Sequence, residues 1–496
     1  MKYLIAIDQG TTSSRAMAFD LNGVPLTSHQ IEITQYFPNP GWVEHDGEEI
    51  LATTIECVKH VLNSVSQKGY KTPLSIGITN QRETCLLWDR HTGEPIGKAL
   101  VWQDRRTADF CAELKERGLE PTIVNKTGLL IDPYFSASKL NWMLHQSDDI
   151  RELANKGELA FGTIDSFLLW HLTGGRHQTD VTNASRTMLM NIHTMKWDEE
   201  LLDIFGVPIE VLPEICENTA DFGVTKQELF GCEIPIGAMI GDQQAAAVGQ
   251  GCIEAGMSKS TYGTGCFLLH NTGNKVPVSQ HKLLATVAYQ VKGEVSYALE
   301  GSIFIAGAAV QWLRDGLSII PSADVTEQLA CQLEHNNGVY MVPAFVGLGA
   351  PHWDPDARGA IYGITRDTGV CEFVRAGLES VVYQTHDLIH AVNMDSGKSC
   401  DALRVDGGMA VNNWLMQFMA DVLDMKVEVP KVIETTALGA AFLAGISAGA
   451  FTGLSDVKRF RHVGKSFSPN MTPAERVKLL SGWDDAVRRT LKNKDD

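Results

Sequence analysis

The feature that most constrains the fold is a strand–turn–strand unit that occurs at the start of each half of the chain. Residues 4–23 read LIAIDQGTTSSRAMAFDLNG, two apolar runs around a bend with an acid, a glycine and four consecutive hydroxyl side chains. Residues 258–273, SKSTYGTGCFLLHNTG, repeat this plan around a glycine–threonine bend. A plain hairpin needs only glycine with Asn or Asp in its turn. The surplus hydroxyl groups therefore indicate that the first bend holds something polar.

The segments after the first hairpin have the spacing of an α/β unit. Apolar periodicity predicts a helix from about residue 48 to 66 and a strand at 74–79, which runs into the polar turn NQRE. Residues 234–241 predict a second strand, followed by a helix that Asp242 would cap. Strands that alternate with helices in this way favour an α/β fold.

The second half has the same grammar further along the chain. Residues 403–423 predict a strand, a Gly–Gly turn and a helix whose apolar positions, beginning with Val411 and Trp414, fall at helical spacing. The similarity lies in the order of elements rather than in sequence identity. A chain of 496 residues also exceeds what one hydrophobic core usually supports. We therefore expect two domains, residues 1–252 and 253–496.

Composition excludes several classes of partner. Lys and Arg number 42 against 60 Asp and Glu, a net charge of −18, which disfavours nucleic acids and anionic membrane surfaces. The uncharged run at 435–454 is rich in small residues, so we interpret it as a helix packed inside a domain rather than a membrane span. The ten cysteines show no C-x-x-C pair, and the N-terminus has too short an apolar run for a signal peptide. These features favour a reducing, cytoplasmic location.

Three turns rich in glycine and hydroxyl residues at strand ends can form a phosphate cradle. Glycine lets a phosphate approach the backbone, while N–H and hydroxyl groups donate without bulk. No G-x-x-x-x-G-K-[ST] loop, no G-x-G-x-x-G before a helix and no protein-kinase motif set is present. Any one of the turns is equally well explained as an ordinary hairpin. The three together favour nucleotide binding.

The motifs resemble those of a known ATPase superfamily. AIDQGTTSSRA, YGTGCF and RVDGGMAVNN are similar to the two phosphate hairpins and the adenosine motif of the sugar kinase, actin and heat-shock chaperone superfamily. Within it, the chain resembles the FGGY carbohydrate kinases, and the glycerol kinases among them most closely. The similarity runs in order from about residue 3 to 450 through the blocks PNPGWVEHD, GITNQRET, VWQDRR, TGLLIDPYFSASKLNW, NASRTMLMNIHT, GDQQAA, YGTGCF, ALEGSIFIAGAAVQWLRD, PAFVGLGAPHWDPDARG and TALGAAFLAG.

The resemblance implies a fold and a reaction. The fold would be α/β, with two ribonuclease-H-like domains, as in actin-like ATPases, around a central interdomain cleft. The reaction would be transfer of a phosphoryl group from ATP to glycerol, with Mg²⁺, to give sn-glycerol 3-phosphate and ADP. In-line phosphoryl transfer asks the protein for positioning, charge stabilisation and an acid that takes the acceptor proton. The resemblance also implies a homodimer or homotetramer.

The resemblance assigns roles to individual residues. Asp242 would be the general base, and Asp8 would hold Mg²⁺ largely through water, as a hard cation with few carboxylate ligands prefers. The residues implied to bind the nucleotide are Thr11, Thr12, Ser13, Arg15, Thr264, Gly307, Gln311, Gly408 and Asn412. The residues implied to bind glycerol are Arg82, Glu83, Trp102, Tyr134, Asp242, Gln243 and Phe267.

Each of these residues also has an ordinary structural explanation. Asp8 would serve as a turn cap, Arg82–Glu83 as a surface ion pair, and Trp102 and Phe267 as core aromatics; only the motif context argues otherwise. Three alternatives to a glycerol kinase follow: a pentulose or other polyol kinase of the same family, a filament or chaperone ATPase, and a binding protein without catalysis. A filament would pellet with ATP, and a chaperone's ATP hydrolysis would respond to peptides.

Overall fold

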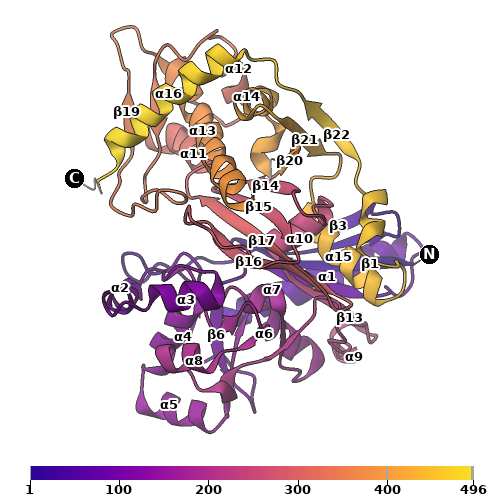
Figure 1. Ribbon diagram of the computed structural model, residues 1–496. Helices are drawn as coiled ribbons and strands as arrows, with labels where there is room; N and C mark the ends of the chain where they lie inside the picture. Colours follow the sequence, from indigo (N-terminus) through magenta and orange to yellow (C-terminus); the bar gives the residue numbers. More distant parts are fainter. Residues whose placement is uncertain (1, 398–399, 493–496) are drawn as a thin grey trace.

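The computed structural model describes residues 2–397 and 400–492, and it contains two large β-sheets, one in each half of the chain (Figure 1). The first sheet has the order β13–β5–β1–β2–β3, with β1, β5 and β13 parallel and β1–β2–β3 an antiparallel meander. Its strands are β1 (Tyr3–Gln9), β2 (Ser13–Asp20), β3 (Pro25–Glu32), β5 (Ile76–Asn80) and β13 (Ile236–Gly241).

The second sheet repeats the plan of the first. Its order is β16–β17–β15–β14–β20–β21–β22, with β14, β20 and β21 parallel and β14–β15–β17 antiparallel. The series β21–β20–β14–β15–β17 thus corresponds strand by strand to β13–β5–β1–β2–β3, which confirms the repeated α/β unit. The strands are β14 (Ser258–Tyr262), β15 (Cys266–Gly273), β16 (Leu284–Val291), β17 (Glu294–Ile303), β20 (Ala402–Asp406), β21 (Lys426–Pro430) and β22 (Val463–Phe467).

Smaller sheets lie beside the two large sheets in both halves of the chain. One has the order β4–β7–β6–β8, and the others are the pairs β9–β12, β10–β11 and β18–β19. Their strands are β4 (Glu44–His45), β6 (Cys85–Asp89), β7 (Ala99–Leu100), β8 (Leu159–Thr163), β9 (Gln178–Asp180), β10 (Met190–Asn191), β11 (Lys196–Trp197), β12 (Glu214–Cys216), β18 (Tyr340–Val342) and β19 (Ala360–Tyr362).

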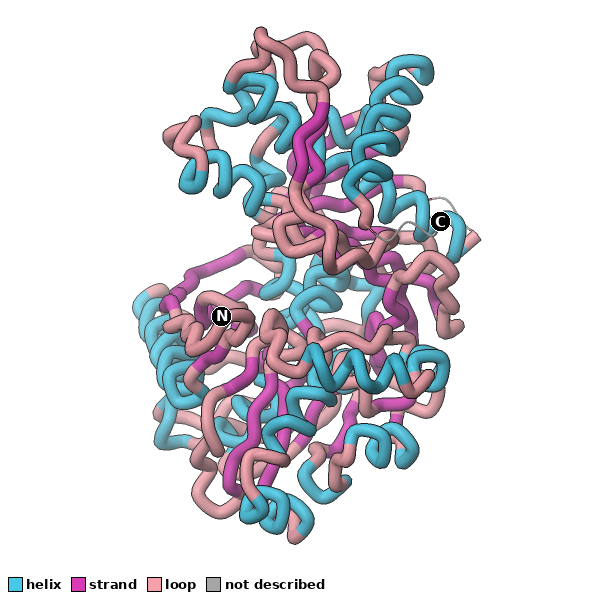
Figure 2. The backbone as a smooth tube through the Cα atoms, turned by 90° about the vertical axis from the view of Figure 1, so that its left-hand side faces the viewer, coloured by secondary structure: helices cyan, strands magenta, loops and turns pink. Residues whose placement is uncertain are grey.

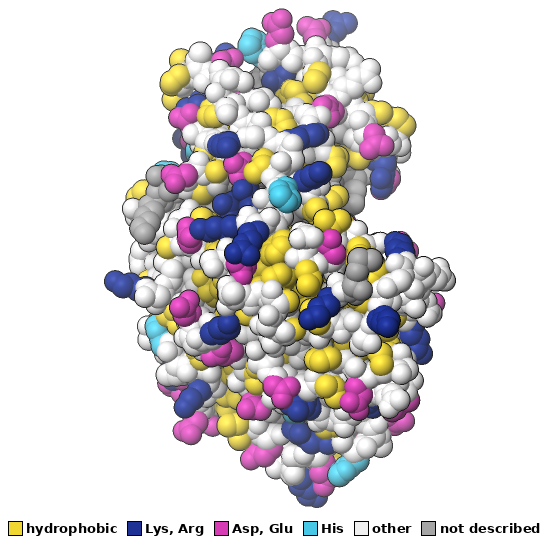
Figure 3. All heavy atoms as spheres, turned by 90° about the vertical axis from the view of Figure 1, so that its right-hand side faces the viewer, with side chains coloured by type: hydrophobic (Ala, Val, Ile, Leu, Met, Phe, Trp, Pro, Cys, Tyr) yellow, Lys and Arg dark blue, Asp and Glu magenta, His cyan; other side chains and the backbone are white. Residues whose placement is uncertain are grey.

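Helices flank the strands in both halves (Figure 2). The first half contains α1 (Gly47–Gln67), α2 (Ala108–Glu116), α3 (Glu120–Thr127), α4 (Ser136–Leu144), α5 (Asp148–Asn155), α6 (Ile164–Thr173), α7 (Val181–Ala184), α8 (Glu199–Phe205), α9 (Gln227–Phe230) and α10 (Asp242–Gly249). The second half contains α11 (Gly307–Gln311), α12 (Val325–Ala330), α13 (Val370–Ser396), α14 (Asn413–Leu423), α15 (Thr435–Ser447) and α16 (Pro473–Thr490). In the space-filling view, the molecule narrows between its upper and lower parts (Figure 3).

Two details of the sequence expectations were wrong. Asp242 is the first residue of α10 rather than its cap, because Gly241 takes the extended N-cap conformation and the Asp242 carboxylate accepts from the neighbouring Gln243 N–H. Val411 does not belong to the apolar face of α14: it lies on a separate 3₁₀ turn and is 63% exposed. The Gly407–Gly408 turn therefore leads into the 3₁₀ turn, and the side chain of Asn412 caps α14.

Residues 435–447 of the small-residue run form α15, a short buried helix that packs against α10 and the first sheet. No helix in residues 2–397 and 400–492 has the length and apolar character to span a membrane. The crossing of α10 and α15 depends on glycine: a Cβ at Gly439 would lie 2.0 Å from the Ala245 carbonyl oxygen, and one at Gly249 would lie 2.0 Å from that of Thr435. Small residues thus allow the two halves to meet backbone to backbone.

Replacement of Gly439 by alanine is expected to lower the free energy of unfolding by about 1–3 kcal/mol, because the new methyl group meets a rigid carbonyl rather than a movable side chain. The matched control is Gly377→Ala in α13, where a Cβ would meet only side-chain atoms, Leu313 Cδ1 at 3.2 Å and Met341 Sδ at 3.9 Å. That change is expected to be neutral or slightly stabilising, since alanine favours helix. Chemical denaturation of both variants measures the difference. Equal stability of the two variants would contradict the close-contact explanation.

Candidate active site

The candidate site lies where parallel strands of the first sheet end. Asp8 on β1 pairs with Thr79 on β5, and Gly241 on β13 pairs with Asn80, so the carboxyl ends of the three strands meet at one edge. Ligands of open α/β sheets bind at this edge. The residues that follow β5 and β13 are the Gln81–Thr84 turn and Asp242. The topology therefore brings the two predicted acids to the same edge as Arg82 and Glu83.

Arg82 is the centre of the acceptor set. Its side chain is 2% exposed, and its Nε lies 3.4 Å from Asp242 Oδ1 and 3.7 Å from Glu83 Oε1. Its Nη2 donates to the Tyr134 hydroxyl at 3.4 Å. Arg82 and Glu83 are both buried, so they do not form the surface ion pair considered as the alternative.

Aromatic rings complete the acceptor set. The Trp102 ring centroid lies 5.6 Å from that of Tyr134 and 6.1 Å from that of Phe267, both edge to face. Phe267 comes from β15, so the second half of the chain supplies one wall. Gln243, the seventh residue, accepts from the buried Lys259 ammonium at 2.5 Å. All seven residues expected at the acceptor site thus lie in one contiguous cluster.

Asp242 has the electrostatics of a proton acceptor. Burial raises the pKa of its carboxyl group to about 6, against the opposing effect of Arg82, and the nearby Glu83 and Asp8 charges act in the same direction as burial. Its side chain is nevertheless 29% exposed, so the carboxylate can reach a ligand. Carboxyl groups with a pKa shifted toward neutrality are suited to general base chemistry.

The bend between β1 and β2 presents polar groups close to the acceptor cluster. Thr11 Oγ1 accepts from the Trp102 indole N–H at 2.8 Å, which ties the bend to the acceptor wall. Thr12 is exposed, and Ser13 Oγ accepts from Gln30 Nε2 at 2.9 Å. The hydroxyl groups predicted to hold phosphates therefore lie in and next to the bend that follows β1.

Arg15, which is predicted to add a cation for the phosphates, is already paired with two carboxylates. Its guanidinium donates to Asp8 Oδ2 at 2.5 Å and to the carboxylate of Glu434, which the sequence analysis did not single out. Both ion pairs are only partly buried, with Arg15 20% exposed. A phosphate at the bend would therefore compete with two carboxylates for this cation.

The second half contributes a matching edge. Thr261 on β14 pairs with Asp406 on β20, so the Gly263–Thr264 bend and the Gly407–Gly408 turn adjoin. Backbone bonds then bring α11 to the bend: the Gly307 N–H donates to the Gly263 carbonyl at 3.0 Å, as the Ala308 N–H does to that of Thr264.

The remaining residues predicted on the nucleotide side are less occupied by protein contacts. Thr264, Gln311 and Gly408 are exposed, which leaves them available to a ligand. Asn412 is already used: its Oδ1 accepts from the Leu415 N–H at 2.9 Å and its Nδ2 donates to Thr326. The structure therefore gathers these four residues and Gly307 around two adjoining turns, with Asn412 also fixing the start of α14.

Several functional candidates were not found from the sequence. Arg186 and Glu300 are fully buried beside Arg82, and Lys259 joins Gln243. Arg186 lies in the block NASRTMLMNIHT and Glu300 in ALEGSIFIAG, so the blocks themselves were the available signal. Behind the site, the Gly241 N–H donates to Thr182 Oγ1 at 2.9 Å, which anchors the strand end before Asp242.

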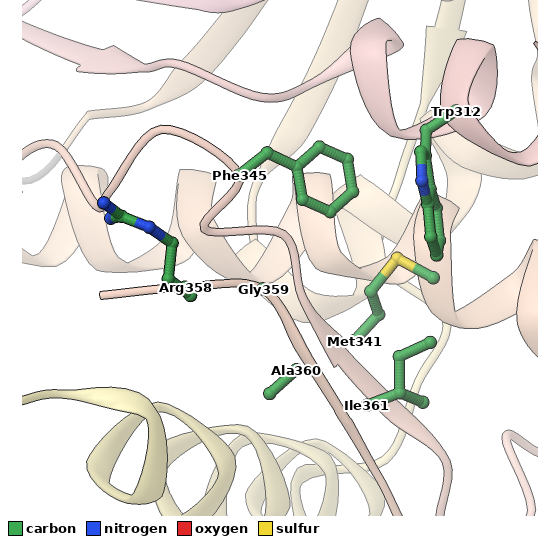
Figure 4. A pocket seen from close by; sticks show the side chains of 7 residues that line it. All are labelled: Trp312, Met341, Phe345, Arg358, Gly359, Ala360 and Ile361. Atoms are coloured by element: carbon green, nitrogen blue, oxygen red, sulfur yellow. The ribbon is translucent and has the colours of Figure 1, made fainter. Parts of the chain in front are cut away.

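A separate cavity of about 360 Å³ lies in the second half, outside this cluster (Figure 4). Trp312, which follows Gln311, and Phe345 form its aromatic wall with ring centroids 5.1 Å apart. Arg358 lies at one side with its guanidinium directed away from the two rings. None of the residues predicted to bind the acceptor lines this cavity.

Comparisons with known proteins place the chain in a family. Residues 3–249 match the N-terminal domain, and residues 259–448 the C-terminal domain, of the FGGY family of carbohydrate kinases. The chain therefore belongs to the FGGY family of carbohydrate kinases, and its class is that of an ATP-dependent sugar or polyol kinase with the actin-like ATPase fold.

Individual relatives are similar over nearly their whole length. Glycerol kinase 1 of Pseudomonas aeruginosa is 57% identical over 98% of this chain and 98% of its own, and the glycerol kinase of Alcanivorax borkumensis is 55% identical over 99% and 98%. The crystal structure of Plasmodium falciparum glycerol kinase with ADP superposes with a TM-score of 0.94 at 39% identity, covering 100% of this chain and 99% of the other. Gluconate kinase from Lactobacillus acidophilus, at 23% identity and a TM-score of 0.88 over 98% and 97%, shares the fold.

Proposed function

We propose that the protein transfers the γ-phosphoryl group of ATP to glycerol, giving sn-glycerol 3-phosphate and ADP. The observation that carries the proposal is the acceptor cluster, in which Glu83, Tyr134 and Asp242 lie around Arg82 and the Trp102 ring packs against the rings of Tyr134 and Phe267. Identities of 53–57% with glycerol kinases over almost the full length support the same acceptor.

The acceptor cluster fits a small polyol. Glycerol offers hydroxyl groups that both donate and accept, on a short apolar stem. Arg82 supplies donors and Glu83 an acceptor side by side, while the Tyr134 hydroxyl can do either. Burial raises the pKa of Tyr134, so its hydroxyl keeps its proton at neutral pH. The rings of Trp102 and Phe267 would cover the carbon stem.

Asp242 would orient the acceptor hydroxyl and take its proton as the bond to phosphorus forms. Because the transition state of phosphoryl transfer is loose, positioning and electrostatic stabilisation matter more than covalent chemistry. The Thr11–Ser13 bend and the Thr264 bend, one from each half, would hold the phosphates in line. Closure of the two halves would exclude water, which would otherwise compete as the acceptor.

Mg²⁺ is the implied metal, and Asp8 is the residue that would hold it. No group of three or more His, Cys, Asp or Glu side chains among residues 2–397 and 400–492 is arranged as a metal cage. This agrees with Mg²⁺ chemistry, since that ion typically uses one or two carboxylates together with water and the substrate's phosphates. When bound, the ion would neutralise phosphate charge. The ion pair of Asp8 with Arg15 would keep the end of β1 in position to hold the ion.

The decisive experiment measures ADP release from Mg-ATP with glycerol, dihydroxyacetone, erythritol, xylitol and xylulose supplied separately. Glycerol should be much the best acceptor. Preference for a five-carbon sugar would keep the kinase but overturn the acceptor assignments at Arg82, Glu83 and Tyr134. No acceptor-dependent release at all would overturn the proposal. A sedimentation assay with ATP and a peptide-stimulation assay test the filament and chaperone alternatives.

Three further expectations belong to this proposal. The domain boundary is proposed between residues 252 and 253, inside the stretch 250–258 that neither family match covers. The protein is proposed to act in the cytoplasm, in line with its ten free cysteines. It is proposed to form a homodimer or homotetramer, which light scattering of the purified protein measures.

The pH dependence of kcat/KM for glycerol should report Asp242. Its pKa of about 6 means that the base is protonated, and inactive, below that pH. We therefore expect kcat/KM to fall about tenfold per pH unit below about pH 6 and to level off above it. The measurement is a pH series at saturating Mg-ATP. A profile that stays flat well below pH 6 would contradict the raised pKa of Asp242, because an unshifted carboxyl group would still be ionised there.

A further inference from the structure

A buried carboxylate in the second half forms an ion pair with the first-half arginine that is assigned to the acceptor. Glu300 lies on β17 and is fully buried. Its Oε2 accepts from Arg82 Nη1 at 2.5 Å and its Oε1 from Arg82 Nη2 at 3.0 Å, a bidentate pair. Such a fork-to-fork arrangement fixes the plane of the guanidinium as well as its position.

Arg186 shares the same carboxylate. Its Nη2 donates to Glu300 Oε1 at 2.8 Å, and its Nε donates to Glu83 Oε1 at 2.7 Å. Its guanidinium also lies over the rings of Tyr134 and Phe135, at 5.6 and 5.2 Å. Arg186 and Glu300 therefore hold three of the residues assigned to glycerol, namely Arg82, Glu83 and Tyr134, without belonging to that set.

The ion pair with Glu300 determines which N–H donors of Arg82 remain available to a ligand. Glu300 occupies the edge formed by the two terminal nitrogens. The contacts of Nε with Asp242 and of Nη2 with Tyr134 are both long, at 3.4 Å, and thus easily exchanged for an acceptor hydroxyl. Glu300 thereby turns the Nε side of Arg82 toward the acceptor position.

The same carboxylate balances charge. Arg82 and Arg186 carry two positive charges, and Glu83 and Glu300 carry two negative charges, all within side chains at most 2% exposed. Burial alone would raise the pKa of Glu300, but Arg186 and Arg82 lower it to about 2, so it stays ionised. The buried quartet is therefore neutral, which suits an uncharged acceptor. Each arginine of the quartet is thus paired with a carboxylate.

We propose that Glu300 is a positioning residue that aims Arg82 at the acceptor hydroxyls and, by cancelling its charge, makes the site selective for an uncharged polyol over an acidic one. This inference rests on the proposed function. It predicts two separable effects of losing the Glu300 charge: weaker glycerol binding, and stronger binding of a three-carbon hydroxy acid such as glycerate.

The test is Glu300→Gln, which keeps the shape and removes the charge. The KM for glycerol should rise about tenfold or more, with a smaller change in kcat, because Arg82 is misaimed while Asp242 remains. Glycerate, added as a competitive inhibitor, should bind to Glu300→Gln more tightly than to the original protein, by about tenfold or more relative to glycerol. Glu300→Asp, which keeps the charge, should restore the exclusion of glycerate.

The matched control is Glu379→Gln. Glu379 is also fully buried and paired with an arginine, Arg375, at 2.7 Å, but both residues lie on α13 and neither is assigned to the acceptor cluster. That variant should lose thermal stability with little change in KM or in glycerate inhibition. Equal behaviour of the two variants in both kinetic readouts would overturn the proposal.

A double variant keeps the test decisive where Glu300→Gln alone does not fold. Glu300→Gln with Arg186→Met removes one charge of each sign, so the selectivity against glycerate should return while the KM for glycerol stays high. A double variant that binds glycerate tightly would overturn the charge-balancing role, and one with an unchanged KM would overturn the positioning role. Absence of glycerol turnover in the original protein would instead remove the proposed function on which the inference rests.

Discussion

Asp242→Asn is expected to lower kcat roughly 10²- to 10⁴-fold, the usual range for loss of a general base. Asparagine matches aspartate in size but cannot accept the proton of the acceptor hydroxyl. Its amide oxygen can still accept from the Gln243 N–H, the contact that Asp242 makes at the start of α10. Steady-state kinetics with glycerol and Mg-ATP measure the loss, and the KM for ATP should change little.

The comparison variant for Asp242 is Asp165→Asn, at another buried acid of the first half. Asp165 accepts from Thr163 and Thr179 on β8 and β9 and, at 3.5 Å, from Asn80 on β5, and it is not one of the residues assigned to the acceptor or the nucleotide. Asp165→Asn should lose stability in thermal denaturation but keep its kcat in the kinetic assay. Asp242→Asn should keep its stability and lose kcat. A kcat within about threefold of the original in Asp242→Asn would mean that another group takes the proton.

Much of this site was predictable from sequence because its parts are local. The position of Thr11, Thr12 and Ser13 next to one another is fixed by the local bend between two strands and does not depend on contacts with distant residues. Residues that follow parallel strands, such as Asp242 after β13, meet at one edge by the rules of α/β sheets. The repeated strand order in the two sheets likewise follows from the repeated hairpin pattern.

The contacts that were missed join residues remote in sequence. Arg82 and Glu300 are 218 positions apart, and Arg15 and Glu434 are 419 apart. No local periodicity relates such residues, because their partnership arises only when the two halves pack. The role of Asp242 as a cap was wrong for a different reason: glycine at 241 adopts the cap conformation itself, which shifts the helix start by one residue.

The second large effect is expected at Arg82. Arg82→Met keeps an unbranched side chain but leaves Glu300 with Arg186 as its remaining partner. Removing one member of a buried ion pair typically costs about 3–5 kcal/mol of unfolding free energy, and the lower end is expected here because Arg186 remains. The kcat/KM for glycerol should also fall on the order of 10³-fold, because the hydroxyl groups of the bound acceptor would be buried without the N–H donors of Arg82.

Arg106→Met separates these two effects. Arg106 is 1% exposed, pairs with Glu44 and Asp104, and lies over the ring of Trp42 at 3.7 Å. It therefore matches Arg82 in burial and in partners of opposite charge. Denaturant titration should show a comparable loss of stability for both variants. Kinetics below the unfolding transition should show a large loss of kcat/KM only for Arg82→Met.

The comparison decides what Arg82 contributes. If both variants lose stability and keep kcat/KM, then Arg82 is a structural ion pair, and acceptor binding must rest on Glu83, Tyr134 and Asp242. If Arg82→Met loses kcat/KM through the KM, the guanidinium binds ground state and transition state alike. If the loss lies in kcat, Arg82 acts mainly by holding the acceptor against Asp242, 3.4 Å from its Nε, as the phosphoryl group is transferred.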